Sequence, residues 1–351
     1  MPLFPMKRLV LSFSAWSALA GFVTAGWLYG VSMVVLNSPV DLSASNDQSV
    51  LWDVPPGGRL GEINRQLRAE GIIRYPQLIS IYAILFQKTT VRAGEYSIET
   101  NDTPMTLLRK FNRGEVIQHA ITFPEGWSFQ MWISHLGQIA QFEKDIALGP
   151  KELLRRAGLT EANPEGWLFP DTYSYTSTSS AIDIIKQAYR RMQSTLAKEW
   201  ALRAVDLPYE SAYDALIMAS IIEKETGLVS EMPIIAGVFV RRLALGMRLQ
   251  TDPTVIYGMA DSYRGNITRA DLRRPTAYNT YIIDGLPPTP IAMPSARAIY
   301  AALHPEQGPS LYFVARGDGG HYFSSTLEEH NEAVQKYQIQ QRNKNYQSSP
   351  K

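Results

Sequence analysis

The chain has 351 residues, a formal net charge of +1 and no cysteine. Its length is sufficient for two domains and a further segment. The near-neutral charge argues against a nucleic-acid partner. The lack of cysteine excludes disulfide bonds, a thiolate nucleophile and cysteine metal ligands.

The N-terminal segment is predicted to cross a membrane. Lys7 and Arg8 precede residues 9–36, which contain no charged side chain, and about 20 apolar residues are enough to span a bilayer core. The positive charges place residues 1–8 in the cytoplasm and the rest of the chain outside. The alternative is a cleaved signal peptide, but the apolar run continues well beyond the small residues 18–20 that would form its cleavage site.

A polar tether is expected at residues 37–48, followed by a compact mixed unit at 49–118. Strand patterns occupy 50–54 and 94–98, and helical patterns begin near residues 60, 76 and 104. This unit carries no cluster of catalytic side chains, so a binding or spacing role is more plausible for it than chemistry.

An aromatic stretch follows a candidate strand at 116–123. Residues 164–167 (Pro-Glu-Gly-Trp) repeat the turn at 124–127 and lead into Leu-Phe-Pro-Asp-Thr-Tyr. Trp167 and Asp171 therefore lie in a segment that combines aromatic rings with hydrogen-bonding groups. Such segments bind sugar rings, because sugar C–H faces stack on aromatic faces. The alternative is a buried aromatic turn, and the sequence does not decide between them.

The apolar run at 213–222 ends in Glu223-Lys224-Glu225. Ser211 and Asp214 form a capping-box start, and Gly227 is the expected stop. A helix that is apolar on all sides is buried. Glu223 and Glu225 point about 200° apart, so they cannot line one pocket. Glu223 shares its face with small apolar residues, which predicts a raised pKa suited to a general acid; a solvated helix end is the alternative.

The remaining chain supplies loops for a cleft. Asp252-Pro253 is predicted to be the N-cap and first residue of a helix, although Gln250, Thr251 and Asp252 are also candidates for substrate contact. Strands at 311–315 and 321–324 are joined by a glycine-rich hairpin. Thr326 begins a capping box for the last helix, and a polar tail follows at 343–351.

Several common catalytic motifs are absent from the sequence. It has no G-x-S-x-G elbow, P-loop, dinucleotide fingerprint or H-E-x-x-H, and its five histidines lack the spacing of metal ligands. We therefore expect neither a metal nor a cofactor. A membrane-tethered protein with a helix-end carboxylate and aromatic, amide-rich loops suits carbohydrate cleavage outside the cytoplasm.

Several long motifs resemble one known family. The runs EGWLFPDTY, ASIIEKETG, RLQTDPTVIYGM, PTAYNTY, GLPPTPIAMPS and YFVARGDGGHYFSSTLEEHN are similar to those of the YceG-like family of endolytic murein transglycosylases. The resemblance implies an α+β protein with one N-terminal transmembrane helix at 9–36. It also implies a small LysM-like α/β module at 49–118 and a mixed α+β catalytic domain at 119–342.

The resemblance also implies an activity and a place of action. The substrate would be the MurNAc–GlcNAc β-1,4 bond within peptidoglycan strands, cleaved to leave 1,6-anhydro-MurNAc ends without a metal. The protein would lie in the bacterial inner membrane, with its catalytic domain outside the cytoplasm, and terminate nascent strands beside penicillin-binding proteins. A hydrolase of the same bond and a non-catalytic peptidoglycan-binding or scaffold protein are the alternatives.

The family's catalytic Glu is expected at Glu223, the first Glu of the E-K-E-T motif. On this assignment the Glu225→Gln variant should keep most of its activity. The residues expected to position the substrate are Gln250, Thr251, Asp252, Tyr278, Asn279, Tyr281, Trp167 and Asp171.

Overall fold

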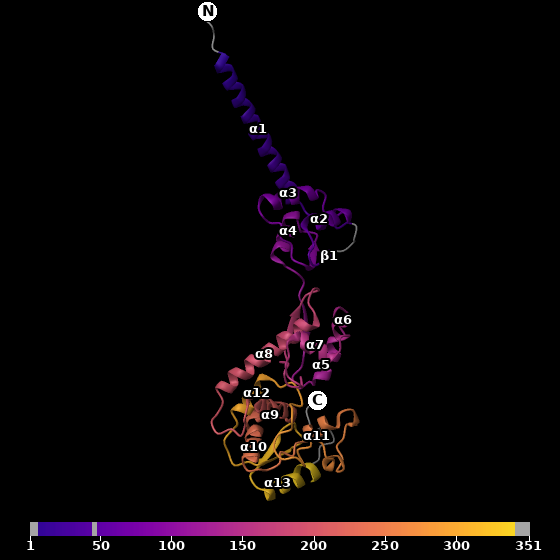
Figure 1. The fold of residues 1–351 in the computed structure, drawn as a ribbon, viewed down its shortest axis with the longest axis vertical. Helices are drawn as coiled ribbons and strands as arrows, with labels where there is room; N and C mark the ends of the chain where they lie inside the picture. The colour runs from indigo at the N-terminus through magenta and orange to yellow at the C-terminus, as the bar shows by residue number, and fades with distance from the viewer. Residues whose placement is uncertain (1–5, 44–47, 341–351) are drawn as a thin grey trace, which may run out of the picture. The chain divides into compact units, whose positions relative to one another are not determined.

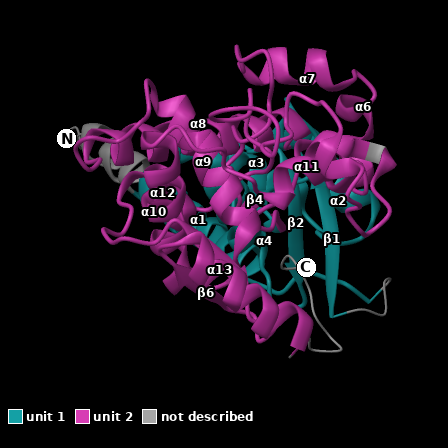
Figure 2. Ribbon diagram, turned by 90° about the horizontal axis from the view of Figure 1, so that it is seen from below, with its two compact units in different colours: residues 1–119, 174–178 teal, residues 120–173, 179–351 magenta. Residues whose placement is uncertain are grey.

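The computed structural model describes residues 6–43 and 48–340 (Figure 1). It is a mixed α+β protein, as predicted, and most of its regular structure is helical. The described residues form three two-stranded sheets. The chain divides into two compact units, one of residues 1–119 with 174–178 and the other of residues 120–173 with 179–351 (Figure 2).

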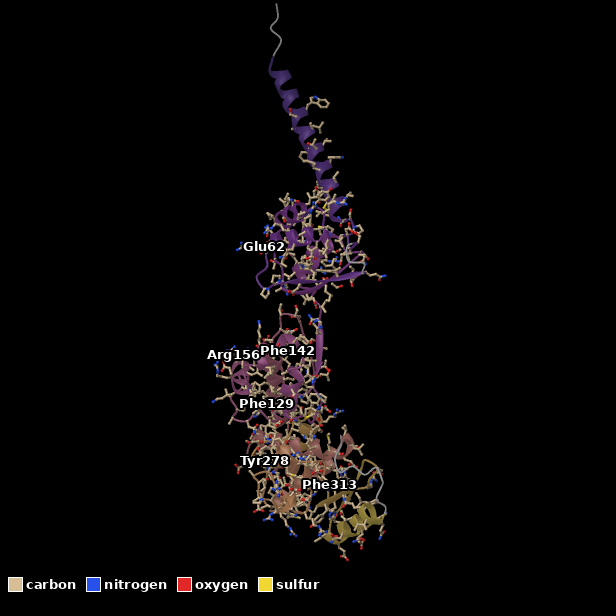
Figure 3. The ribbon with its side chains drawn as sticks, turned by 90° about the vertical axis from the view of Figure 1, so that its right-hand side faces the viewer. Glu62, Phe129, Phe142, Arg156, Tyr278 and Phe313 are labelled. Carbon is tan, nitrogen blue, oxygen red and sulfur yellow. The ribbon has the colours of Figure 1, made fainter. Side chains whose placement is uncertain are left out.

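Helix α1 (Met6–Leu36) matches the predicted apolar segment. Within the described residues, its part Trp16–Leu36 is long and apolar enough to cross a membrane. Side chains along this part project outward from the helix, as Figure 3 shows, and most are exposed. The last turn differs, because Leu36 is only 2% exposed and belongs to the core of the first unit.

The core of the first unit lies between one sheet and three helices. Strand β1 (Ser49–Val54) pairs antiparallel with β2 (Gly94–Glu99). Because side chains alternate across a strand, each strand turns one face inward and Trp52, Val54, Tyr96 and Ile98 are buried. Helices α2 (Leu60–Ala69), α3 (Pro76–Leu85) and α4 (Pro104–Arg113) supply the rest of this core.

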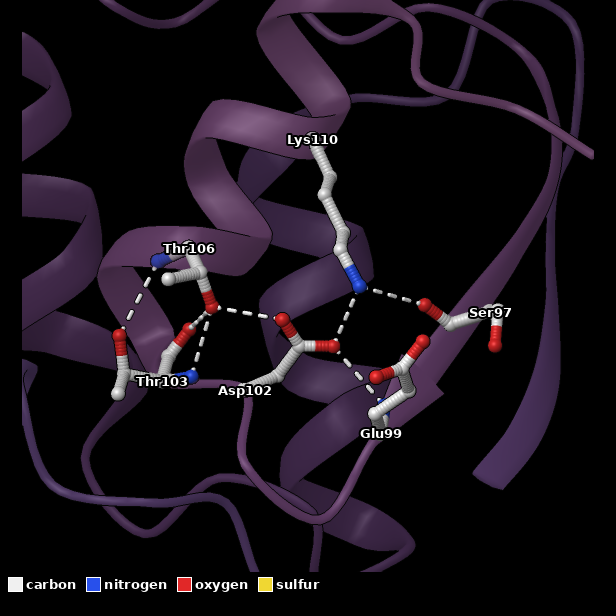
Figure 4. Close-up of polar contacts among 6 residues, drawn as sticks. All are labelled: Ser97, Glu99, Asp102, Thr103, Thr106 and Lys110. Carbon is white, nitrogen blue, oxygen red and sulfur yellow. Dashed lines mark hydrogen bonds and ion pairs between the residues drawn. The ribbon is translucent and has the colours of Figure 1, made fainter. Parts of the chain in front are cut away.

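A buried carboxylate joins α4 to β2 (Figure 4). Asp102 Oδ2 accepts hydrogen bonds from Lys110 Nζ at 2.6 Å and from the backbone N–H of Glu99 at 2.9 Å. Its Oδ1 accepts from the hydroxyl of Thr106 at 2.8 Å. Thr103 and Thr106 also form a capping box at the start of α4. Four side chains and one backbone group thus fix the start of this helix.

The segment expected to be a polar tether, residues 37–48, is partly packed. Val40 and Leu42 are buried in the core of the first unit. The backbone N–H of Val40 donates to the carbonyl of Asp102 at 2.8 Å. Although most residues of this segment are polar, the apolar side chains of Val40 and Leu42 gain free energy by burial. Residues 44–47 lie outside the described part of the chain.

The second unit is mainly helical. Strands β3 (His119–Thr122) and β4 (Thr172–Tyr175) pair with each other, and their residues 120–122 and 172–173 belong to this unit. Its first half also contains the helices α5 (Phe129–Leu136), α6 (Glu143–Ile146), α7 (Pro150–Ala157) and α8 (Ala181–Ala201). Its second half contains α9 (Ala212–Glu225), α10 (Met232–Ala244), α11 (Asp252–Met259), α12 (Ala296–Leu303), β5 (Tyr312–Ala315), β6 (His321–Ser324) and α13 (Leu327–Val334), followed by a π-helical turn at Gln335–Gln340.

Helix α9 is the central rod of this unit, as its sequence predicts. All its residues from Ala215 to Ile222 are buried, and α8, α10, α11 and α12 contact it (Figure 1). Ser211 forms the predicted capping box with Asp214. The helix ends earlier than expected, because Thr226 is extended, with φ −141° and ψ 139°, and is the C-cap in place of Gly227.

The structure also defines the starts of two further helices and the hairpin between β5 and β6. The N-cap of α11 is Thr251 rather than Asp252, so the helix begins one residue before the predicted position. The hairpin of β5 and β6 forms as predicted, with Ala315 opposite His321. Thr326 caps α13 through its capping box with Glu329, which is also as predicted.

Candidate active site

The two glutamates at the end of α9 lie in different surroundings, as the helix geometry predicts. The Thr251 hydroxyl donates a hydrogen bond to Glu225 Oε1. On the other side, Glu223 Oε2 accepts from Ser295, through the backbone N–H at 3.0 Å and the hydroxyl at 2.6 Å. Each carboxylate is therefore fixed by a different loop of the chain.

Glu225 opens on a polar cavity of about 330 Å³. Its side chain is nearly buried, with 8% of the residue exposed. The cavity lies among α9, α10, the start of α11, the β5–β6 hairpin and α13, and Glu223 does not line it. The residues that line it are Glu225, Arg242, Leu249, Gln250, Asp252, Tyr281, Phe313, Val314, Ala315, His321, His330, Val334 and Gln338.

Burial raises the pKa of Glu225 to about 7. The hydrogen bond from Thr251 lowers this pKa, and the negative charge of Asp252 raises it. Removing water destabilises a carboxylate more than a carboxylic acid, which is why burial dominates. Near neutral pH both protonation states of Glu225 are populated, as a group that donates and then accepts a proton requires.

Gln250 is held beside Glu225 in an uncommon backbone conformation. Its φ is +53°, in the left-handed region of the backbone that residues other than glycine and asparagine rarely adopt. Its backbone N–H donates to the carbonyl of Thr280 at 3.1 Å. The guanidinium of Arg242 lies 3.5 Å from its side-chain oxygen. Strain of this kind persists where the surroundings hold it, often at functional sites.

Arg242 is an unusual residue in this cavity because it is buried without a carboxylate partner among the described residues. Its Nε donates to the carbonyl of Leu311 at 2.7 Å, and its Nη1 donates to that of Leu249 at 2.9 Å. It therefore joins α10 to the loop segment that precedes Gln250 and to the residue before the β5–β6 hairpin.

Asp252 and Tyr281 form a second polar pair on the cavity wall. The Tyr281 hydroxyl donates to Asp252 Oδ1 at 2.7 Å. Burial and the neighbouring Asp252 raise the pKa of Tyr281, so the side chain stays a neutral donor. Beneath them the buried hydroxyls of Thr254 and Thr280 are 2.8 Å apart and fix the backbone of Thr251. The loop that carries Gln250, Thr251 and Asp252 is thus rigidly supported.

His321 and His330 also reach this cavity, and sequence reasoning gave them no role. His321 Nδ1 lies 2.7 Å from Glu231 Oε2, and its backbone N–H donates to the other oxygen of Glu231 at 2.9 Å. The ring of His330 stacks on Tyr312 with 5.2 Å between ring centres. Within residues 6–43 and 48–340, no group of three or more acidic or histidine side chains is arranged to hold a metal ion.

Glu223 connects two helices. Ser295 is the N-cap of α12, where its hydroxyl accepts from the backbone N–H of Ala298 at 3.1 Å and donates to Glu223. Burial raises the pKa of Glu223, and the two hydrogen bonds from Ser295 oppose that rise. The Glu125–Arg297 ion pair, at 3.0 Å, also acts on Glu223. These contacts fix the end of α9 to the start of α12.

The remaining predicted site residues lie away from this cavity. Asn279 is buried, and its amide donates to three backbone carbonyls, those of residues 271, 272 and 274. Asp171 pairs with Arg191. Trp167 stacks on Tyr213, with 5.8 Å between ring centres. These three side chains support the fold locally.

Tyr278 belongs to an aromatic contact next to a second buried carboxyl. Its ring meets that of Tyr257 edge to face, with 4.9 Å between ring centres, and it is labelled in Figure 3. The Tyr257 hydroxyl donates to Glu165 Oε2 at 3.1 Å, and the backbone N–H of Phe129 donates to Oε1 at 2.9 Å. Burial raises the pKa of Glu165 to about 7. Glu165 does not line the Glu225 cavity.

Of the predicted site residues, the structure therefore brings Gln250, Thr251, Asp252 and Tyr281 together around Glu225. A buried carboxyl with a pKa near 7 on a polar cavity is the arrangement of a general acid–base enzyme.

The profile of the YceG-like family matches residues 52–336. A Bacillus subtilis protein named endolytic murein transglycosylase is 29% identical over 346 residues, which cover 90% of this chain and 91% of that protein. A Streptococcus pneumoniae protein of the same name is 26% identical and covers 94% of this chain, but this chain spans only 65% of that longer protein. A crystal structure of a yceG-like protein from Listeria monocytogenes is 29% identical, covers 82% of this chain and 99% of that chain, and has a TM-score of 0.49.

The family profile matches well over half of the chain, so the chain belongs to the YceG-like family. This family is the one that the sequence motifs indicated.

Proposed function

We propose that this protein is a lytic transglycosylase that cleaves peptidoglycan strands internally, with Glu225 as its single general acid and base. Family membership and the names of the curated relatives support the reaction class. The observation that carries the assignment of the residue is the nearly buried carboxyl of Glu225, which opens on a polar cavity and has a pKa of about 7.

One carboxyl group is sufficient for this reaction. Protonated Glu225 gives its proton to the glycosidic oxygen, and the bond from that oxygen to C1 of MurNAc breaks. The C6 hydroxyl of the same MurNAc then bonds to C1 and gives its proton to the Glu225 carboxylate. The products are a 1,6-anhydro-MurNAc end and a GlcNAc end, and Glu225 is protonated again. Because the nucleophile is part of the substrate, no second carboxylate has to position a water molecule.

The surrounding residues have roles that match this chemistry. The Asp252 carboxylate lines the cavity and would stabilise the positive charge that develops on the sugar ring. Gln250 offers both an amide donor and an amide acceptor to the substrate. Tyr281 orients Asp252, and Arg242 supports the backbone at Gln250. These four side chains would position a sugar against Glu225.

This proposal replaces Glu223, the carboxylate favoured by the sequence, with its neighbour. Glu223 already accepts two hydrogen bonds from Ser295 at a helix start, and it does not line the cavity. A carboxylate held in this way has a structural task, whereas Glu225 accepts one hydroxyl and faces open space among polar side chains.

We further propose that α1 anchors the protein in the bacterial cytoplasmic membrane, with residues 1–8 in the cytoplasm and the chain from residue 37 onward outside. The support is one long apolar helix preceded by Lys7 and Arg8. The substrate would then be peptidoglycan made close to this membrane. Termination of nascent strands beside penicillin-binding proteins is the physiological role that this location favours.

The test is a digest of defined glycan strands by the wild-type protein and by the Glu225→Gln and Glu223→Gln variants, with products identified by mass. We expect anhydro ends from the wild type and from Glu223→Gln. Glu225→Gln should be slower by about 10²–10⁴-fold, which is the usual contribution of a general acid. Reducing ends from the wild type would show a hydrolase. Wild-type rates in Glu225→Gln would show that Glu225 is not the acid.

A further inference from the structure

Helix α3 exposes an apolar stripe in the first unit. Ile79 and Ala83 face the core at 3% and 0% exposure, whereas Ile84 and Leu85 are 67% and 72% exposed. Ile81, at 54%, lies on the same outer face, since residues three and four apart are neighbours on a helix. The next residue after the helix, Phe86, is also half-exposed. A contiguous apolar patch of this kind marks a surface that has a partner.

The position of this stripe identifies the partner. Helix α3 contacts the end of α1, and Figure 1 shows α3 beside that end. Met33 and Leu36, in the last turns of α1, pack into the core of the same unit. The stripe and the end of the anchor are therefore parts of one packed unit, and the stripe cannot move far from the point where α1 leaves the bilayer.

The length of α1 places the end of the helix beside the outer headgroups. A helix rises about 1.5 Å per residue, so Trp27 lies about 30 Å along the axis from Lys7, a distance equal to the thickness of a hydrocarbon core. Leu36 lies about 14 Å beyond Trp27, and the headgroup layer on each side is about 5–8 Å thick, so the first unit begins just outside the headgroups. Trp27 and Tyr29 are exposed on α1, at the level where aromatic residues gather in membrane proteins.

A basic groove adjoins the stripe. It has a volume of about 550 Å³ and lies between Asn37, which follows α1, and helices α3 and α4. Lys88, Arg109 and Arg113 supply three positive charges to its walls. Tyr82, on α3, also lines the groove, and its ring packs on Phe86 at 4.4 Å. Positive charges next to an apolar stripe match the phosphates and the upper acyl chains of phospholipids.

We propose that the first unit docks on the outer surface of the membrane that α1 spans. The stripe of Ile81, Ile84 and Leu85 enters the boundary between headgroups and acyl chains. Lys88, Arg109 and Arg113 bind phospholipid phosphates. This docking rests on the proposed anchor, and it fixes the first unit against the bilayer instead of leaving it to move on a tether.

The test uses the full chain in phospholipid vesicles. Because the protein has no cysteine, single cysteines at chosen positions can carry an environment-sensitive fluorophore. Ile84→Cys probes the stripe and Phe22→Cys probes the anchor. Leu51→Cys is the matched control, since Leu51 is an equally exposed leucine of β1, in the same unit but away from α1 (Figure 1). Lipids spin-labelled near the headgroup or deep in the acyl chain then report depth.

We expect the headgroup-level label to quench most of the fluorescence at position 84, the deep label to quench position 22, and neither to quench position 51. Quenching at 22 without quenching at 84 would overturn the docking and leave the anchor intact. No quenching at either position would overturn the anchor. Blue-shifted but unquenched fluorescence at 84 would mean that protein covers the stripe, which would also overturn the proposal.

Charge-neutralising variants test the groove separately. Replacing Arg109 and Arg113 by glutamine in the Ile84→Cys protein should reduce quenching at position 84 in vesicles that contain anionic lipid. The matched control replaces Arg65 and Arg68, two exposed arginines of α2 that do not line the groove, and should leave quenching unchanged. Equal quenching in both double variants would show that the groove does not bind lipid.

Discussion

The carboxyl groups of Glu223 and Glu225 lie on two sides of α9 and have different surroundings. On one side, Glu223 accepts two hydrogen bonds from Ser295 and fixes the start of α12. On the other side, Glu225 accepts one hydrogen bond from Thr251 and faces a polar cavity. The two glutamates are only two residues apart, yet one is held at the start of a helix and the other faces a cavity.

The number of hydrogen-bond donors affects how readily a buried carboxyl group exchanges a proton. Burial raises the pKa of both groups. A carboxylate with several donors is stabilised in its charged form and has little tendency to exchange a proton. A carboxyl group with few donors and an open side can give its proton to a substrate. Substitutions at Glu225 or at Glu223 alter one side of α9 at a time.

The largest expected effect concerns the pH dependence of stability. The pKa of Glu225 is raised from an ordinary value of 4.5 to about 7. Its contribution to stability is therefore complete below pH 4.5 and is lost as the pH rises through 7, by roughly 3 kcal/mol. Glu225→Gln cannot ionise, so we expect this variant to be more stable than the wild type at pH 8, in urea unfolding of the full chain in detergent.

The matched control is Glu165→Gln, since Glu165 also has a pKa of about 7 but does not line the cavity. Each variant should remove part of the stability loss between pH 5 and 8, and only Glu225→Gln should slow the reaction by about 10²–10⁴-fold. If Glu225→Gln unfolded with the same pH dependence as the wild type, the pKa of Glu225 would not be raised in the folded protein.

The second prediction concerns the hydrogen bonds between Glu223 and Ser295. Glu223→Ala removes the acceptor of two hydrogen bonds and should reduce the free energy of unfolding by roughly 2 kcal/mol, because bonds to charged groups contribute about 1.5–3 kcal/mol. Ser295→Ala, which also removes the cap of α12, should cost about 1–2 kcal/mol. The double variant should lose less than the sum of the two.

Activity at a temperature where both variants are folded should remain within a few-fold of the wild type. Loss of activity in Glu223→Gln comparable to that expected for Glu225→Gln would instead support the sequence-based assignment of the catalytic acid to Glu223.

Local sequence patterns predicted much of the fold but not which side of α9 faces the polar cavity. The capping boxes at Ser211 and Thr326 and the β5–β6 hairpin were predictable, because each depends on residues close in sequence. The helical repeat also separated Glu223 from Glu225. Since α9 is apolar all round, no polar face indicated which carboxyl meets a cavity. That depends on Ser295 and on the loop at Thr251, both distant in sequence.

A third prediction concerns Gln250, whose left-handed backbone faces the cavity. Gln250→Gly relaxes the backbone strain and removes the amide, so stability should rise by about 1 kcal/mol while activity falls. Gln250→Ala removes the amide and keeps the strain, so activity should fall equally without a gain in stability. Activity rates together with urea unfolding distinguish the two effects. Full activity in both variants would exclude Gln250 from substrate positioning.

The smallest and most specific effect is a pair of opposite shifts in the pH profile of activity. Thr251 donates a hydrogen bond that lowers the pKa of Glu225, whereas the charge of Asp252 raises it. Thr251→Val should therefore move the alkaline decline in activity to higher pH, since Glu225 stays protonated longer. Asp252→Asn should move the same decline to lower pH, even if the maximal rate also falls. Both shifts are measured from kcat/KM against pH.

If Glu223 were the acid, neither residue would move the profile, because Ser295 is the side chain that hydrogen-bonds to Glu223. The pair of directions therefore identifies which side of α9 donates the proton, independently of how much activity either variant retains.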